Sequence, residues 1–324
     1  MKPTSLVMHS DCGLHDTGWG HPEHQGRLPA VVKAIYEDTP ALLEVMLQEE
    51  AVPVEETDIL RVHTPGHLER VRRAVEEATE SGEQVSLDTD TIVSAASWDA
   101  ALAAAGSAVT GARLVLDGAA ETSFAIARPP GHHATPDRAM GFCLFNNVAI
   151  AARWAQEERG IDRVLIIDWD VHHGNGTQDI FYEDPSVYYL SLHQSPHYPG
   201  TGSVDERGAG PGLGTTRNIP LPAGTSAAEY RDYFEGALDA TLAEFEPELV
   251  LISAGYDSLA GDPLGGFQLE PADMHALARS IIEKTEGTAE GRVIAVLEGG
   301  YAPSRVGAGV VDTIRALAGI PPRD

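Results

Sequence analysis

The sequence predicts a single-domain, three-layer α/β/α fold with a mostly parallel central sheet. Short apolar runs rich in β-branched residues alternate with longer stretches of helical periodicity, which is typical of parallel strands joined by crossover helices. Strands that are apolar throughout are expected to be buried on both faces, so helices should cover both sides of the sheet. The 324 residues are 43% apolar and contain no repeat or low-complexity linker, and one domain over residues 1–324 is therefore expected.

The predicted elements follow from these two periodicities. In chain order, the expected helices are Leu28–Asp38, His67–Ser81, Trp98–Asp117, Val148–Glu158, Ala227–Glu244 and Pro271–Lys284. The expected strands are Thr122–Ala127, Val164–Ile167, Val187–Leu192, Leu249–Ser253 and Val293–Leu297. A stretch rich in glycine and proline, from Gly200 to Gly224, is expected to form a long surface loop.

Each predicted strand runs directly into a polar segment. In chain order these segments are Arg128–Ala134, Asp168–Gly176, His193–Gln194, Ala254–Asp257 and Glu298–Tyr301. In open α/β sheets the ligand site lies beyond the carboxyl ends of the strands. The five segments are therefore expected to converge, although they are far apart in the sequence.

The segment after the second strand indicates a metal site. Asp168, Asp170 and His172 alternate along the chain and should share one face of a strand end. Carboxylates and imidazole buried together need a counter-charge, which a divalent metal supplies. Asp170 and His172 with Asp257 make a plausible three-ligand site with an open position. Zinc is the first expectation, Fe²⁺ or Co²⁺ also suit these ligands, and a polar strand end with solvated acids is the alternative.

Two adjacent histidines and a tyrosine supply acid–base chemistry. His132 and His133 follow a rigid Pro-Pro-Gly bend, so that one imidazole can take a proton from water while the other stays charged or orients the site. Asp168 and Asn175 are the expected orienting partners, and an acid on one ring and an amide on the other should push the two pKa values apart. Tyr301 follows two glycines and could donate to an oxyanion, the alternative being an ordinary core tyrosine. Together these groups predict metal-assisted hydrolysis of an amide.

Composition limits the partners and the compartment. The formal charge of −27 argues against nucleic acid as a direct partner. Because the acids are spread along the chain, the charge suits a salty cytoplasm better than attraction of a cationic substrate. No apolar run approaches the length of a membrane span, so no membrane contact is expected. The two cysteines, Cys12 and Cys143, fit a reducing cytoplasm.

Several ordered motifs together resemble one known family. They are His21–Glu23 with Arg27, Arg128–His133, Gly141–Asn147, Asp168–Thr177, Pro199–Gly202, Ser253–Gly265 and Leu297–Tyr301. Between about residues 9 and 305, the chain resembles the zinc-dependent histone deacetylase superfamily, which has the arginase/deacetylase α/β fold. The resemblance is strongest to its class II-like branch and to prokaryotic and archaeal relatives.

This resemblance implies hydrolysis of an acyl-lysine or a similar N-acyl amine, and it implies a role for each matched residue. Zinc is assigned to Asp170, His172 and Asp257, general acid–base work to His133, an electrostatic role to His132, and polarisation of the carbonyl to Tyr301. Phe142 and Tyr198 would form the walls of a narrow tunnel, and Gly141 would accept the substrate amide hydrogen. Arg27 would lie near an internal acetate channel. A potassium site is implied at Asp168, Asp170, His172, Ser191 and Leu192.

Two departures refine what the resemblance implies. Polyamine-specific relatives carry an acid where this chain has Leu264, so an apolar residue there argues against a polycation substrate. Related two-metal enzymes use additional aspartates, whereas the second position of Asp257-Ser258-Leu259 is Ser and the run Asp168–His172 lacks their arrangement, which favours a single catalytic metal. The leading hypothesis is deacetylation of lysine in proteins or peptides. The alternatives are a small-molecule N-acyl amine amidohydrolase, such as one for acetylpolyamines, and a non-catalytic acyl-lysine binding protein.

Overall fold

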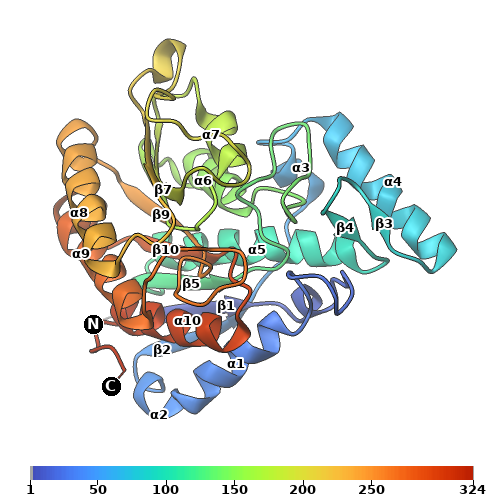
Figure 1. The fold of residues 1–324 in the computed structure, drawn as a ribbon, viewed down its shortest axis with the longest axis horizontal. Coiled ribbons are helices and arrows are strands. Elements are labelled where there is room, and N and C mark those ends of the chain that lie inside the picture. Colours follow the sequence, from blue (N-terminus) through green and yellow to red (C-terminus); the bar gives the residue numbers. More distant parts are fainter. Residues whose placement is uncertain (1–2, 324) are drawn as a thin grey trace.

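An eight-stranded parallel sheet forms the centre of the molecule (Figure 1). The computed structural model describes residues 3–323. The strand order is β2-β1-β5-β10-β9-β6-β7-β8, and every neighbouring pair is parallel. The bounds are β1 Thr4–Met8, β2 Met46–Glu50, β5 Thr122–Ile126, β6 Val164–Asp168, β7 Val187–Gln194, β8 Thr216–Leu221, β9 Leu249–Ala254 and β10 Val293–Leu297. A separate antiparallel pair is formed by β3 (Val85–Ser86) and β4 (Ile92–Val93).

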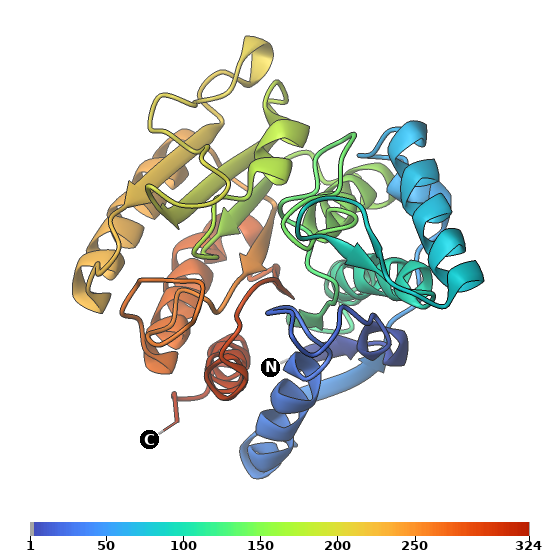
Figure 2. The same ribbon diagram turned by 45° about the vertical axis from the view of Figure 1, so that its right-hand side comes forward.

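Helices cover both faces of this sheet, as Figures 1 and 2 show. On one face α5 (Ser97–Leu116) packs on β5, β1, β10 and α6 (Asn147–Arg159). On the other face α1 (Arg27–Glu37), α10 (Pro303–Leu317), α9 (Pro271–Ala289) and α8 (Ala227–Glu244) pack in that order. The remaining helices are α2 Thr39–Leu42, α3 Glu56–Ile59, α4 Pro65–Ser81 and α7 Asn175–Phe181, with 3₁₀ turns at Ser10–Gly13 and Gly210–Gly212. The predicted three-layer α/β/α architecture is confirmed.

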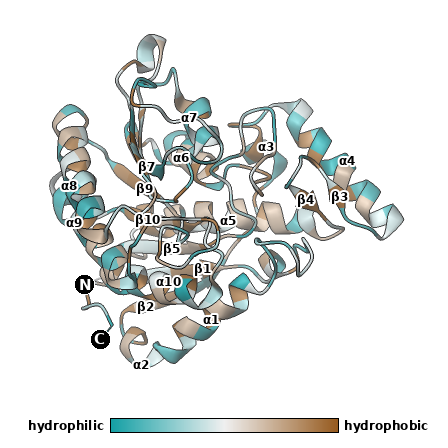
Figure 3. Ribbon diagram, viewed as in Figure 1, coloured by the Kyte–Doolittle hydropathy of each residue, from teal (hydrophilic) through white to brown (hydrophobic). Residues whose placement is uncertain are grey.

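Hydropathy explains which faces are buried. In Figure 3 the strands of the central sheet are largely hydrophobic, whereas α4, α8 and α9 alternate between hydrophilic and hydrophobic residues. Strands β5, β6, β9 and β10 are buried at every residue, which is expected for strands covered on both sides. The core therefore lies between the sheet and its two helical layers.

The five predicted strands are present and are neighbours in the centre of the sheet, whereas three outer strands were missed. The prediction of a continuous loop from Gly200 to Gly224 was wrong, because β8 lies within it and pairs with β7. This strand contains Pro220 and is only partly buried, so it lacks the continuous apolar run of the central strands. Proline is tolerated there because β8 is an edge strand.

The expectation that no apolar run approaches the length of a membrane span was also wrong. Within residues 3–323, α5 is the one helix with sufficient length and apolar composition to cross a membrane. Most of it is buried inside the protein, and Gly111 packs closely against Ser123 of β5 and Ile294 of β10. A helix that is apolar on nearly all sides is also what a central core position requires.

The strand order places the later strands between the earlier ones. β5 and β6 follow one another in the sequence, but in the sheet they are separated by β10 and β9, which come later in the sequence. Since all eight strands are parallel, the carboxyl ends of these four central strands lie at one edge of the sheet. The register pairs Asp168, the last residue of β6, with Ser253 of β9, so these two strands end at nearly the same level, whereas β7 continues beyond Ser191 to Gln194. The polar segments that follow them are thereby brought together.

Candidate functional site

Two carboxylates and an imidazole meet beyond β6 and β9. Potential ligand atoms of Asp170, His172 and Asp257 lie within 4.8 Å of one another, and all three residues are buried. Nδ1 of His172 is 3.0 Å from Oδ1 of Asp170 and 3.1 Å from Oδ2 of Asp257. One nitrogen therefore faces both carboxylates, and these are the three residues expected to form the metal site.

Backbone N–H groups around the three residues orient their potential ligand atoms toward a common point. Gly299 N–H donates to Oδ2 of Asp170 (2.9 Å), and Val171 N–H donates to Oδ1 of Asp257 (2.9 Å). The other oxygen of each carboxylate is the one that faces the imidazole. A Cβ on Gly255 or Gly299 would collide with these carboxylates, so only glycine allows this close approach of the backbone. The donor set and its enclosure fit a divalent cation.

Electrostatics in this cluster also favour a bound cation. Burial, together with the nearby charge of Asp170, raises the pKa of Asp257 to about 7. Burial disfavours a charged His172, but its contacts with Asp170 and Asp257 outweigh this and raise its pKa to about 10. The two carboxylates thus require a positive charge between them, which either a protonated imidazole or a metal ion provides.

The tandem histidines lie beside this cluster. Nδ1 of His132 is 3.0 Å from Oδ2 of Asp168, and Nδ1 of His133 is 2.9 Å from Oδ1 of Asn175. The ring centroids of the two histidines are 4.0 Å apart. The loop after β5 thus presents both rings to residues from the end of β6 and the start of α7. The sequence predicted one acid and one amide partner, and in the structure the acid lies against His132 and the amide against His133.

The two imidazoles have opposite pKa shifts. Burial disfavours the charged form of His132, but Asp170 and Asp168 outweigh it and raise its pKa to about 10. Burial, with the positive charges of His132 and His172, holds the pKa of His133 well below 6.5. At neutral pH one ring is therefore charged while its neighbour is neutral. His132 is suited to electrostatic stabilisation and His133 to accepting a proton.

A cavity of about 460 Å³ opens from this cluster to the surface. It is lined by Asp90, His133, Gly141, Phe142, His172, Gln194, His197, Tyr198, Pro263, Leu264, Gly265, Gly266 and Tyr301. The Phe142 ring packs edge-on against Tyr301 (5.7 Å between centroids), and Tyr198 packs edge-on against His133 (5.1 Å). Gly141 adopts a φ of 55°, and a Cβ there would collide with the His133 ring. The residues expected in the tunnel, including Leu264, thus line one cavity.

Residues of two other expected sites lie on β7 and on α1. Ser191 and Leu192 lie on β7 beside the end of β6, and Ser191 is paired with Asp168 in the register. Arg27 is fully buried and donates to the carbonyls of Gly300 and Glu298, each at 2.6 Å. The potassium site and the acetate channel stay predictions.

Sequence reasoning missed several residues of this region. Asp90 precedes β4 and reaches the cavity from outside the central sheet, so no strand-end pattern identifies it. The His197 ring stacks on that of His172 (4.8 Å), and its Nε2 lies 2.8 Å from the carbonyl of Leu264. Glu298 was noted in a strand-end segment but received no role. Its position directly after a buried strand was the available signal.

Comparisons with known proteins identify the family of this chain. The model of the histone deacetylase domain matches residues 21–317. "Histone deacetylase 14, chloroplastic" of Arabidopsis thaliana is 40% identical over 97% of this chain and 77% of its own length. A "Probable deacetylase" of Archaeoglobus fulgidus is 39% identical over 92% of this chain and 81% of its own. The structure titled "Crystal Structure of HDA15 HD domain" superposes with a TM-score of 0.91 at 34% identity, covering 100% of this chain and 91% of that one.

Proposed function

Because the chain belongs to the histone deacetylase family, we propose that it is a zinc-dependent deacetylase acting on acetyl-lysine in proteins or peptides. The observation that carries the proposal is the cavity. His133, His172 and Tyr301 line it together with Phe142 and Tyr198, so an acyl group between the two aromatic rings would meet a proton acceptor, a metal ligand and a hydroxyl donor.

The metal would be held by Asp170, His172 and Asp257. Zinc, or Fe²⁺ or Co²⁺ in its place, supplies a Lewis acid that polarises the acyl carbonyl and lowers the pKa of the attacking water. The chain's own contribution is to orient both carboxylates through the N–H groups of Gly299 and Val171. A single metal is proposed, because these three residues form one cluster.

His133 would move the proton. With Asn175 Oδ1 accepting from Nδ1–H of His133, the Nε2 atom is left free to take the proton of water and later to protonate the leaving amine. His132 holds its own proton on Nδ1 against Asp168 and contributes a fixed positive charge. His133 would thus act as the base and His132 as the electrostatic stabiliser.

Tyr301 would stabilise the oxyanion. Burial and the charge of Asp257 raise its pKa well above 10, so the hydroxyl stays protonated and able to donate. Its backbone N–H donates to Asp262 (2.6 Å), and the Arg27 guanidinium lies 5.2 Å from the centre of its ring. Both contacts fix the tyrosine at the edge of the cavity.

The cavity walls support a lysine side chain over a polycation. Phe142 and Tyr198 offer apolar faces to an unbranched alkyl chain, and Leu264 adds a further apolar surface. Asp90 is the one acid among the residues that line the cavity outside the proposed metal site. It does not occupy the position of Leu264, where the polyamine-specific relatives carry their acid. An acetylpolyamine would need more negative charge along its length.

Steady-state kinetics on two substrates tests this function. The zinc-reconstituted protein should show a higher kcat/KM on an acetyl-lysine peptide than on acetylated polyamines, and the metal-depleted protein should hydrolyse neither. A preference for the polyamine would instead identify a small-molecule amidohydrolase. Binding of the peptide to zinc-loaded protein without turnover would identify an acyl-lysine binding protein.

We further propose a salty, reducing cytoplasm as the setting. The formal charge of −27 supports adaptation to high salt, and both cysteines are free and buried. Activity measured in matched KCl and NaCl separates two effects. Equal gains in both salts indicate screening, whereas a gain in KCl alone indicates a potassium site beside Asp168 and Ser191.

A further inference from the structure

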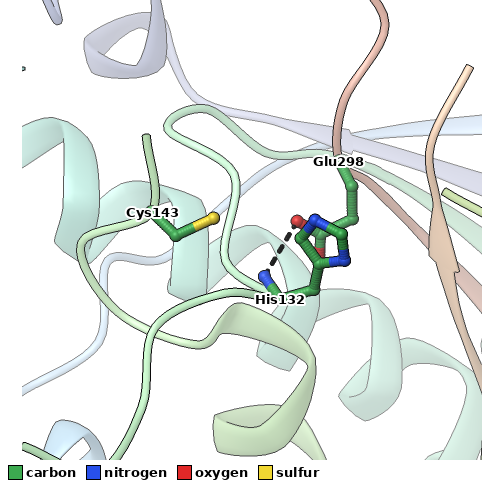
Figure 4. Close-up of side chains that lie close together, drawn as sticks. All are labelled: His132, Cys143 and Glu298. Carbon is green, nitrogen blue, oxygen red and sulfur yellow. Dashed lines mark hydrogen bonds between the residues drawn. The ribbon is translucent and has the colours of Figure 1, made fainter. Parts of the chain in front are cut away.

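Glu298 is a fully buried acid that the proposed reaction does not use. It follows β10 and points toward the loop that carries the tandem histidines (Figure 4). Figure 4 also shows the sulfur of Cys143 directed toward Glu298 and His132. Burying a carboxylate is costly unless hydrogen bonds or a nearby positive charge compensate, so the position of Glu298 needs an explanation.

Its contacts are with backbone rather than with another charged side chain. Oε2 of Glu298 accepts hydrogen bonds from the N–H groups of Gly131 (2.6 Å) and His132 (3.2 Å). Oε1 lies 3.4 Å from the hydroxyl of Ser253, and the Glu298 carbonyl accepts from Arg27 (2.6 Å). One side chain thus joins the end of β10 to the histidine loop.

A second metal site is the rival explanation. His132, Cys143 and Glu298 offer potential ligand atoms within 4.8 Å of one another. One potential ligand atom of each residue, however, is already engaged in a hydrogen bond. Nδ1 of His132 lies against Asp168, the Cys143 thiol donates to the carbonyl of Gly141 (3.3 Å), and Oε2 of Glu298 accepts two N–H groups. The hydrogen bonds favour a closed polar cluster over an ion site.

We propose that Glu298 is a positioning residue that fixes the backbone of Gly131 and His132, so that both tandem histidines meet their partners. Binding the two N–H groups sets the direction in which the loop leaves β5. His132 then reaches Asp168 while His133 reaches Asn175, with the ring centroids 4.0 Å apart. The catalytic consequence rests on the proposed function, whereas the effect on the loop does not.

Matched variants separate hydrogen-bond geometry from charge. In Glu298→Gln the amide oxygen can accept both N–H groups and the amide nitrogen can donate to Ser253, so positioning is kept while charge is lost. Glu298→Ala loses both. Ser253→Ala removes the weak contact to Oε1 alone and serves as the control. The expected result is near wild-type kcat in Glu298→Gln and Ser253→Ala, and about a 100-fold lower kcat with little change in KM or zinc content in Glu298→Ala.

Amide hydrogen exchange provides a readout that does not depend on activity. Exchange at Gly131 and His132 should accelerate in Glu298→Ala but not in Glu298→Gln. If the wild-type protein turns over none of the acyl substrates, the proposed function fails. The difference in exchange rate between Glu298→Ala and Glu298→Gln still decides whether Glu298 positions the loop. If Glu298→Ala does not fold, Glu298→Met, which keeps most of the side-chain volume but removes both oxygens, replaces it in the same comparison with Glu298→Gln.

Two results would overturn the proposal. The first is a folded, zinc-loaded Glu298→Gln protein with kcat reduced by about 100-fold, because charge rather than positioning would then matter. The second is a second equivalent of zinc bound by the wild-type protein and lost in both Glu298→Gln and Cys143→Ser. That result would make the cluster a metal site.

Discussion

The floor and the rim of the cavity are built in different ways. The floor consists of buried residues at the ends of β5, β6, β9 and β10, and backbone N–H groups orient their side chains. The rim consists of residues such as Asp90, Tyr198 and Leu264, which come from connecting segments and are partly exposed. Chemistry is therefore expected to depend on the floor and substrate choice on the rim. Changes at the floor should lower kcat, whereas changes at the rim should alter relative kcat/KM values.

The largest effect is expected from the carboxylates of the floor. Asp257→Asn keeps an acceptor for the N–H of Val171 but removes one negative charge from the proposed metal site. Zinc affinity and activity should both fall by at least about 100-fold, since a ligand as well as its charge is lost. Metal analysis after dialysis, together with kcat/KM, measures both. Full zinc occupancy with normal activity would remove Asp257 from the ligand set.

Tyr301→Phe should leave the metal in place and lower turnover. The change removes one hydroxyl from the cavity, and the loss of an oxyanion donor costs about 2.7–4 kcal/mol, or roughly 10²–10³ in kcat. KM should change little, because the hydroxyl acts mainly on charge that develops in the transition state. Near-normal kcat in zinc-loaded Tyr301→Phe would contradict the proposed role.

The floor is also where the sequence was most informative, and the reason is physical. A strand buried on both faces needs a continuous apolar run, so its end is visible in the sequence. Polar residues at or directly after that end, such as Asp168 and Asp170, are expected to belong to a ligand site, because such sites lie beyond the carboxyl ends of parallel strands. The same reasoning predicted an acid on one histidine and an amide on the other, and the structure places Asp168 against His132 and Asn175 against His133.

The rim could not be predicted from the residues in the same way. Asp90 belongs to a segment between two strands of two residues each, and its arrival at the cavity depends on tertiary packing. Phe142, Tyr198 and Leu264 were expected in the tunnel only because their motifs resemble a known family. Edge strand β8 was missed for a related reason, since partial burial does not require an apolar run. Among the strands, a continuous apolar run identifies those buried on both faces, and a partly buried strand such as β8 is not detected.

A third prediction compares the two histidines of the floor. His132 faces a carboxylate and has a raised pKa, whereas His133 faces an amide and has a lowered one. In Asn175→Asp a carboxylate would stabilise the charged form of His133 and raise its pKa. Since the proposed base must be neutral, the acidic limb of kcat/KM should move to higher pH. If the pKa of His133 rises by one unit, kcat/KM falls about tenfold at pH values below the acidic limbs of both the wild type and the variant.

The pH–rate profile of kcat/KM checks this shift. Wild-type activity should fall only below pH 6.5, because the pKa of His133 lies below that value. The variant should recover at alkaline pH, which distinguishes a shifted base from a damaged site. Asn175→Gln is the neutral comparison and should not move the limb. An acidic limb that stays in place in Asn175→Asp would mean that another group carries the proton.

The smallest effect is expected at the rim, from Leu264→Glu. A carboxylate on this wall would attract the ammonium groups of an acetylated polyamine, and a gain of about 1.4 kcal/mol corresponds to tenfold in relative kcat/KM. Leu264→Gln, which adds polarity without charge, is the control. Turnover of zinc-loaded protein on the acetyl-lysine peptide should be largely kept, since no floor residue is changed. If Leu264→Glu instead lowered kcat on both substrates to the level of Tyr301→Phe, the division between floor and rim would fail.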